Sequence, residues 1–222
     1  PTRPLGSARG GGGRRSPPSA GPRWRWGGPG PRPPPHRVML DELGARGELD
    51  WSRCAIDPVS VRAFKRGPLT GPNPTVRGKL GSKIHLLTDR SGLPLSLGIS
   101  AGNTHDSLGL QPLVRGISPI CSRRGPRRRR PAKLHADKGC DYDHLRRWLH
   151  QQGIRHRMAR EGIESSRRLG CHSWVVERTV AWFASCRRLH RHYERKAERF
   201  LALVGIAAAL IDYRRLARYD IR

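Results

Sequence analysis

Three acidic residues stand out in this sequence because of where they lie. Asp57 and Asp137 each follow a short apolar stretch that is typical of a buried strand, and strand ends are where sheet proteins tend to place their sites. Glu177 lies within the apolar stretch WVVERTVAW, residues 174–182, so we expect its carboxylate to be partly desolvated. A buried carboxylate is unfavourable unless a cation or another partner lies opposite it.

The chemistry that three such acids could perform together is metal-assisted reaction at phosphodiesters. Two Mg²⁺ ions, about 3.5 to 4 Å apart, can activate a nucleophile and stabilise a leaving oxygen. Such hard cations prefer oxygen ligands, and carboxylates supply both the oxygens and the negative charge. For Glu177 the alternative is a structural ion pair with Arg178 or another arginine. Spacing along the chain does not decide between these interpretations, because a sheet has to bring the three acids together.

The charge of the chain points to a polyanionic partner. Lys and Arg total 44 against 17 Asp and Glu, a formal net charge of +27 over 222 residues. Self-repulsion on this scale destabilises a compact monomer unless a polyanion screens it. Nucleic acid is the first candidate, because neutralising phosphates releases counterions and drives binding. The alternative is that part of the arginine content reflects the codon usage of a GC-rich genome.

Other features argue against membranes and structural metals. No apolar segment typical of a secretory signal opens the chain. The longest apolar run, Phe200 to Ile211, has 12 residues, whereas a membrane-spanning helix needs roughly 20. The five cysteines form no CxxC pair and no zinc-like spacing with histidine. Their odd number and scattered positions favour reduced thiols, and we therefore expect a cytoplasmic, nucleoid-associated protein.

The first 37 residues differ in composition from the rest. They contain 10 Pro, 9 Gly and 8 Arg and no acidic residue. Such a segment cannot bury enough apolar surface to offset its ordering entropy, so we expect residues 1–37 to be disordered. One interpretation is a basic arm on DNA. The interpretation that we favour is translated DNA from a shifted frame or an upstream start.

Periodicity and turn signals predict an α/β protein with a mixed sheet flanked by helices. Arg90, Ser91 and Gly92 predict a hairpin turn between two of the strands. The predicted domains are a linker or remnant helix at 38–50, one catalytic domain at 51–217 and a tail at 218–222. The predicted strands are 52–57, 83–89, 93–100, 133–137 and 154–160, and the predicted helices are 105–114, 142–152, 173–190 and 194–216.

Four long motifs carry a family resemblance that runs from about Leu43 to Leu216. They are LDWSRCAIDPVSVRAFKRGPLTGPNP (49–74), GSKIHLLTDRSGLPLSLGISAGNTHDS (81–107), LHADKGCDYDHLRRWL (134–149) and WVVERTVAWFASCRRLHRHYER (174–195). In content, order and separation they resemble DDE transposases of bacterial insertion sequences, most similar to the insertion-sequence-five group of actinobacterial type. The resemblance implies an RNase H-like fold, with one acid on the first strand, one on the fourth and a glutamate on a late helix.

By position, Asp57, Asp137 and Glu177 match the catalytic, metal-binding triad of that family. The implied reaction is hydrolysis at transposon ends with two Mg²⁺ or Mn²⁺ ions, followed by attack of the freed 3′-hydroxyl on target DNA. The implied partners are double-stranded DNA, as terminal inverted repeats and target, and a second copy of the chain. The alternatives are an inactive remnant that binds DNA through charge alone and an RNase H-like nuclease with another substrate.

Arginines near the predicted site are candidates for contacts with DNA phosphates, the alternative being a solvated surface. The predicted DNA-contacting residues are Arg127, Arg128, Arg129, Arg130, Arg178, Arg187 and Arg188. The first four belong to a run of six arginines in the eight residues 123–130, which we expect to form a mobile loop. Asn103, His105 and Asp106 are interpreted as structural residues at a helix start.

The sequence departs from the family pattern at several positions. Cys140 stands where relatives usually carry tyrosine, Ser173 where they tend to carry arginine, and Pro58 where a small hydroxyl residue is more usual. The N-terminal helical DNA-recognition region of the family is replaced by residues 1–37. These departures bear on present-day activity and on recognition of specific ends.

Overall fold

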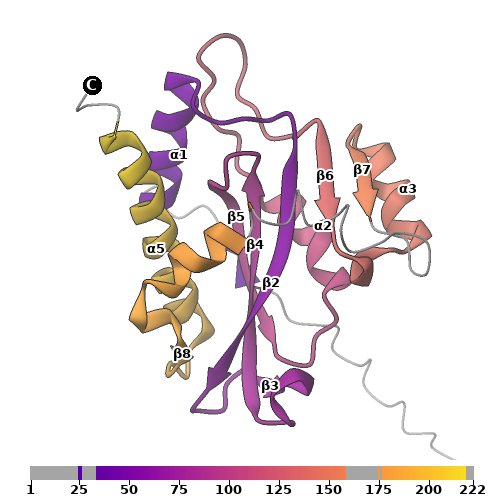
Figure 1. Cartoon of the computed structure of the whole chain (residues 1–222), viewed down its shortest axis with the longest axis vertical. Coiled ribbons are helices and arrows are strands. Elements are labelled where there is room, and N and C mark those ends of the chain that lie inside the picture. The colour runs from indigo at the N-terminus through magenta and orange to yellow at the C-terminus, as the bar shows by residue number, and fades with distance from the viewer. Residues whose placement is uncertain (1–24, 27–33, 159–174, 176, 219–222) are drawn as a thin grey trace, which may run out of the picture.

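The computed structural model of this chain describes residues 25–26, 34–158, 175 and 177–218. From residue 51 onward, apart from two-residue strands at 71–72 and 191–192, its elements follow the predicted order of strand, hairpin, helix, strand, helix, strand and helices (Figure 1). The strands are β1 (Arg25–Trp26), β2 (Cys54–Ala63), β3 (Gly71–Pro72), β4 (Leu80–Asp89), β5 (Pro94–Ala101), β6 (Lys133–Ala136), β7 (Arg155–Met158) and β8 (Arg191–His192). The helices are α1 (Pro35–Arg46), α2 (Ser107–Gly116), α3 (Asp143–Gln151), α5 (Ala197–Ala217) and a helix that contains residues 177–184, with single 3₁₀ turns at Pro74–Val76, Lys138–Cys140 and Arg187–Leu189.

The strands of the described residues form one mixed sheet. Its path is β1-β5-β4-β2-β6-β7, with β3 paired to β4 and β8 paired to β2. The long strand β4 pairs antiparallel to both β5 and β2, whereas β6 pairs parallel to β2 and β7 pairs parallel to β6. The predicted α/β class with an RNase H-like mixed sheet is confirmed.

Helices cover both faces of this sheet. Ser82 and His85 are an odd number of residues apart on β4, so their side chains point to opposite faces. Ser82 Oγ lies 2.8 Å from Nδ1 of His192, whose ring stacks on Phe200 of α5. A Cβ on Gly109 of α2 would lie 2.8 Å from the His85 ring. Figure 1 accordingly shows α1 and α5 on one side and α2 and α3 on the other.

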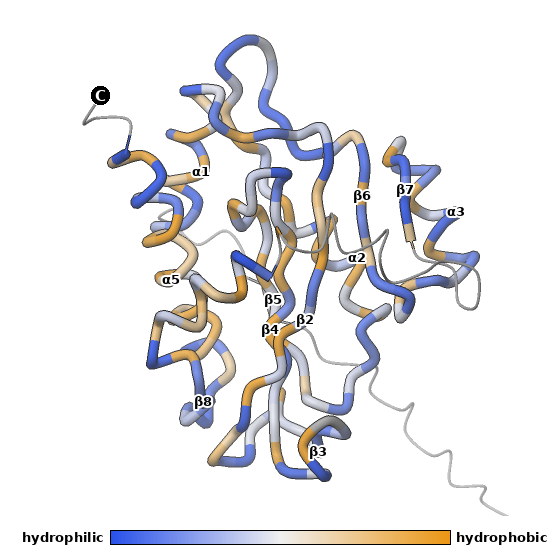
Figure 2. The backbone as a smooth tube through the Cα atoms, in the orientation of Figure 1, coloured by the Kyte–Doolittle hydropathy of each residue, from blue (hydrophilic) through white to orange (hydrophobic). Residues whose placement is uncertain are grey.

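The core therefore lies in two layers, one on each side of the central strands. Leu86 and Leu87 are adjacent on β4, and both are 0% exposed, which requires cover on both faces. Figure 2 shows hydrophobic residues along the central strands and hydrophilic residues along most of the long loop before β6. In the described part of the chain, no helix is long and apolar enough to cross a membrane.

The structure moves the predicted boundary of the folded part toward the N-terminus. Arg25 and Trp26 pair with Ile99 and Gly98 on β5. Helix α1 starts at Pro35, a residue type suited to the first helical position because it has no N–H to leave unpaired. The predicted disordered segment 1–37 is thus too long at its C-terminal end, and its remaining residues lie outside the described ones. The segment 38–50, predicted as a linker or remnant helix, is helical as far as Arg46 and packs on α5.

The contact between α1 and α5 contains a buried carboxylate. The side chain of Asp212 is 0% exposed, and His36 Nε2 lies 3.4 Å from one of its oxygens. Among the described residues, neither oxygen of Asp212 has a hydrogen-bond partner. Burial raises the pKa of Asp212 well above its usual value and lowers the pKa of His36 to about 4. Burial therefore disfavours the charged form of both groups.

Replacement of Asp212 by leucine is expected to stabilise the protein at pH 7 by about 1–3 kcal/mol, because it removes a buried ionisable group. Since the folded-state pKa of Asp212 is raised, its contribution to stability is present below the unfolded-state pKa and is lost as pH rises. The gain should therefore grow from pH 5 to pH 8 in denaturant unfolding curves. Asp143→Asn, at an exposed position on α3, is the control that should change stability by less than about 0.5 kcal/mol. A loss of stability in Asp212→Leu would contradict this account.

Candidate active site

Asp57 and Asp137 reach corresponding positions on neighbouring strands. β2 and β6 are parallel, and Ala55 lies opposite His135 in their register. Each acid lies two residues further along, so both side chains point to the same face. β6 ends at Ala136, whereas β2 continues beyond it. The two acids therefore lie where the sheet opens between these strands.

The expectation that a strand ends at Asp57 is wrong, because Asp57 lies inside β2. The strand pairs with β4 along its length, as far as Arg62 opposite Gly81. Pro58, which suggested an end, lies opposite His85 on β4. Between the end of β6 and the pairing with β8 at Arg62, β2 pairs with β4 along one edge only among the described strands, and a missing backbone N–H is tolerated there.

Glu177 lies on the helix that contains residues 177–184, and its side chain is exposed. One face of this helix packs on the domain. It carries Val175, Thr179 and Phe183, which are spaced four residues apart and are 3%, 0% and 4% exposed. Glu177 belongs to the other face. The expectation that its carboxylate is desolvated by its apolar neighbours in sequence is therefore wrong.

The charges of the other two predicted acids act on the carboxyl group of Asp57. The pKa of Asp57 is raised from 3.8 to about 6, chiefly by burial and then by the charges of Asp137, Asp106 and Glu177. Carboxylates affect one another in this way only when they share a region of the molecule from which water is partly excluded. Asp57, half-buried, is the member of the set that experiences the negative charge of all the others.

Asp106 also belongs to this set of acids, although its position in the sequence suggested a structural residue at a helix start. It lies at the N-cap of α2 without a side-chain capping bond. Its Oδ1 accepts a hydrogen bond of 2.7 Å from Lys83 Nζ, which also donates to the carbonyl of Thr104 at 2.8 Å. The charge of Asp106 also raises the pKa of the buried Cys140 thiol, after the larger effect of burial. A helix-start aspartate carries no signal in sequence that distinguishes this placement from ordinary capping.

The donor set fits a hard divalent cation in chemistry, though it is not a closed cage. Carboxylate oxygens are the ligands that Mg²⁺ and Mn²⁺ prefer, and after burial the negative charges of Asp137, Asp106 and Glu177 raise the pKa of Asp57. Within the described residues, no group of three or more His, Cys, Asp or Glu is close enough to hold a metal ion as it stands. Side-chain rotation of the exposed Asp137 and Glu177 is therefore needed to close the set around an ion.

The predicted DNA-contacting arginines on and after the helix of Glu177 have different environments. Arg178 is half-buried, donates a hydrogen bond of 2.6 Å to the carbonyl of Ser91, and lies 5.1 Å from the ring centre of Trp182. Its guanidinium is thus engaged within the domain, contrary to the prediction that it faces DNA. Arg187 is exposed on the turn after the helix. Arg188 is ion-paired with Glu194 and half-exposed.

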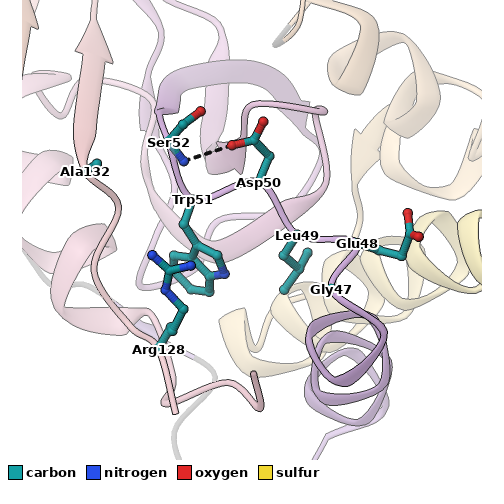
Figure 3. Close-up of a pocket in the computed structure, with 8 residues that line it drawn as sticks. All are labelled: Gly47, Glu48, Leu49, Asp50, Trp51, Ser52, Arg128 and Ala132. Atoms are coloured by element: carbon teal, nitrogen blue, oxygen red, sulfur yellow. Dashed lines mark hydrogen bonds between the residues drawn. The ribbon is translucent and has the colours of Figure 1, made fainter. Parts of the chain in front are cut away.

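The arginine-rich segment before β6 is exposed but is fixed at several points. Ile120 and Arg128 exchange two backbone hydrogen bonds of 2.8 Å, and Arg127 pairs with Asp41 of α1 at 2.8 Å. Arg128 lies over the ring of Trp51 at 5.7 Å, as Figure 3 shows. Because of these contacts, the segment is an anchored loop and not the mobile loop that was predicted. The segment precedes β6, whereas Asp137 follows it, so the two lie at opposite ends of that strand.

A hollow of about 480 Å³ lies beside this segment (Figure 3). Its lining consists of Gly47, Glu48, Leu49, Asp50, Trp51, Ser52, Arg128 and Ala132. None of the three predicted acids contributes to it. The hollow is therefore separate from the candidate active site. Of the sequence departures, Cys140 is buried next to the site, and Ser173 lies outside the described residues.

The mixed sheet thus carries one predicted acid on β2 and one directly after β6, and the third lies on a late helix, which is the arrangement that the family resemblance implies. The chain matches the family described as Transposase DDE domain over residues 51–211. It belongs to this family of DDE transposases. The resemblance to transposases of insertion sequences is thereby confirmed, while the assignment to the insertion-sequence-five group stays a prediction.

Two known proteins resemble the chain. It is 40% identical over 153 residues to a protein of Burkholderia cepacia described as a putative transposase for insertion sequence element IS402, an alignment that covers 69% of this chain and 72% of that protein. The piggyBac transposase, solved as a synaptic complex with hairpin DNA, is similar with a TM-score of 0.47 and 11% identity. That similarity covers 72% of this chain and 46% of the piggyBac chain.

Proposed function

We propose that this chain, as a transposase, cleaves DNA at transposon ends in a metal-dependent reaction and transfers the freed strand into target DNA. The observation that carries the proposal is the placement of Asp57 and Asp137, each two residues beyond the paired residues Ala55 and His135 of the parallel strands β2 and β6. The charges of Asp137 and Glu177 also raise the pKa of Asp57, after the larger effect of burial, which supports a site that these acids share.

Asp57, Asp137 and Glu177 are the residues that would hold one or two Mg²⁺ or Mn²⁺ ions. When bound, such ions supply an activated nucleophile and stabilisation of the leaving oxygen. Asp57 is the fixed member, because it lies inside a paired strand. Asp137 Oδ1 accepts a hydrogen bond of 2.7 Å from Lys138 N, which orients that carboxylate at the end of β6. Glu177 is the acid that the helix of residues 177–184 would contribute.

The proposed substrate is double-stranded DNA, as terminal inverted repeats and as target. Supporting this, the chain carries a net charge of +27 and an exposed arginine segment. Arg127, Arg128, Arg129 and Arg130 are exposed on that segment, and Arg187 and Arg188 are exposed beside the helix of Glu177. We propose these for contacts with phosphates, with a homodimer as the active form and the bacterial nucleoid as its place of action.

A second candidate is a remnant that binds DNA through charge alone. It is favoured by one observation, namely that no described group of acids is close enough to hold an ion without side-chain rotation. The remnant would bind DNA with strong dependence on salt and no preference for sequence, because it would contact phosphates only.

The test compares wild type, Asp137→Asn and Asp143→Asn on a duplex that carries the element's ends, an unrelated duplex and an RNA–DNA hybrid. We expect wild type to nick the first duplex only when Mg²⁺ or Mn²⁺ is added and to lose this activity with EDTA. Asp143→Asn, at an exposed position on α3, should behave like wild type, and Asp137→Asn should be inactive. Cleavage by Asp137→Asn at the wild-type rate would exclude the proposed mechanism. Salt-sensitive binding without cleavage would support the remnant, and preference for the hybrid would support an RNase H-like nuclease.

A further inference from the structure

The turn between β4 and β5 is held rigid by one buried carboxylate. Asp89 is 1% exposed. It accepts hydrogen bonds from the backbone N–H groups of Ser91 and Leu93, both 2.8 Å, and from that of Asp50 at 2.9 Å. Gly92 has φ of 86°, a left-handed conformation that favours glycine. The turn is therefore bonded to itself and to the segment that leads into β2.

Two consecutive carbonyl groups of this turn accept hydrogen bonds from the helix that carries Glu177. Thr179 Oγ1 donates to the Gly92 carbonyl at 2.7 Å, and Arg178 donates to the Ser91 carbonyl at 2.6 Å. Thr179 is 0% exposed, so this contact is shielded from water. The approach is close enough that a Cβ on Gly92 would lie 2.8 Å from Thr179 Oγ1.

These bonds fix the rotation of the helix about its axis and its position along that axis. Glu177, Arg178 and Thr179 are successive residues, and each points roughly 100° from the next around a helix. With Thr179 and Arg178 bound to adjacent carbonyl groups, a rotation or a shift of the helix by one residue would break both contacts. Glu177 is thereby directed away from the packed face.

The same turn is fixed relative to the first acid. β4 pairs with β2 from Cys54 opposite Asp89 to Arg62 opposite Gly81, and Asp57 lies within this span. Hydrogen bonds therefore connect the strand of Asp57, through β4 and the turn, to the helix of Glu177. We propose that the β4–β5 turn sets the position of Glu177 and that Thr179 and Arg178 are positioning residues for this acid, an inference that rests on the proposed metal-dependent function.

A matched pair of variants tests this proposal. Thr179→Val removes the hydroxyl that reaches the turn and keeps the shape of the side chain. Thr88→Val makes the same change at another fully buried threonine, whose Oγ1 has no hydrogen-bond partner in the described structure. Arg178→Lys keeps the charge and a donor, whereas Arg178→Gln shortens the side chain and removes the charge.

Two measurements are made on each full-length variant. The first is amide hydrogen exchange of residues 177–184, which does not depend on metal or on activity. The second is the affinity for Mn²⁺ in the absence of DNA, by titration calorimetry. We expect Thr179→Val to speed exchange of this helix by roughly 5- to 10-fold and to weaken Mn²⁺ binding by about 10- to 100-fold. Thr88→Val should resemble wild type, and Arg178→Lys should retain more affinity for Mn²⁺ than Arg178→Gln.

The outcomes separate the two proposals. Unchanged exchange in Thr179→Val would overturn the docking of the helix on the turn. Faster exchange with Mn²⁺ affinity equal to wild type would show that the contact is structural only, and would leave the proposed function intact. Failure of the wild-type chain to bind Mn²⁺ would overturn the metal-dependent function, together with the positioning role that rests on it.

Discussion

Asp57→Asn is expected to abolish DNA cleavage and at the same time to stabilise the folded chain at alkaline pH. Removing one of three acids that hold a catalytic ion forfeits several kcal/mol of transition-state stabilisation, a loss of about 10³-fold or more in rate. The gain in stability has a separate cause. The folded-state pKa of Asp57 is about 6 instead of 3.8, since burial and the neighbouring acids disfavour its charged form.

The pH range of this gain follows from the direction of the shift. A carboxyl group with a raised pKa contributes stability that is present below the unfolded-state pKa and is lost as pH rises through the folded-state pKa. The difference between 3.8 and about 6 corresponds to an upper limit of roughly 3 kcal/mol. Denaturant unfolding curves of Asp57→Asn should therefore coincide with wild type near pH 4 and show about 1–3 kcal/mol more stability at pH 8.

Asp143→Asn serves as the control for both measurements, since Asp143 is an exposed aspartate on α3. It should alter neither the cleavage rate nor the pH dependence of stability. A stability gain in Asp57→Asn that did not change between pH 4 and pH 8 would show that the charge of Asp57 is not its cause. Equal stability of wild type and Asp57→Asn at pH 8 would mean that neither burial nor the neighbouring acids disfavour the charged form of Asp57.

Gly44→Ala is expected to destabilise the protein by about 3 kcal/mol, the upper end of typical overpacking costs. Gly44 is a buried residue of α1, and a Cβ there would lie 2.1 Å from the carbonyl oxygen of Cys121 and 2.9 Å from a methyl carbon of Ile120. The backbone cannot withdraw easily, because Asp41 of the same helix binds Cys121 N at 2.9 Å. Helix propensity alone predicts the opposite sign, a gain of about 1 kcal/mol.

Gly205→Ala on α5 is the matched control, because no atom lies within 4 Å of a Cβ built at that position. It should stabilise the chain by about 0.5–1 kcal/mol. Thermal unfolding of both variants would therefore give shifts of opposite sign. A stabilised Gly44→Ala protein would contradict the close packing of α1 against residues 120–121.

Element types were largely predictable, because they follow from local patterns. The hairpin of β4 and β5 flanks a turn with glycine at its tip, and the apolar face of α3 recurs at helical spacing with Gly153 at its end. The position of Asp137 directly after β6 was also predicted. These features depend on residues close together in the chain, so local sequence specifies them.

Features that depend on partners distant in the chain were missed. β2 continues past Pro58 because β4 pairs with it, and α1 is a packed helix because α5 covers it. The apolar neighbours of Glu177 in sequence lie on other sides of its helix, so they do not bury the Glu177 side chain. Arg178 donates a hydrogen bond to Ser91, and Asp106 accepts one from Lys83. Each partner is distant along the chain.

The sequence by itself determined the family and, from residue 51 onward, the order of the main elements, and it predicted three candidate acids, because long motifs and short-range patterns carry that information. Only the tertiary structure decided that Asp57 is the half-buried member, that Asp106 joins the acidic set and that the helix of Glu177 is docked on the β4–β5 turn. The physical reason is that burial and charge interactions depend on distances through space, and the register of β2 with β4 and β6 determines those distances.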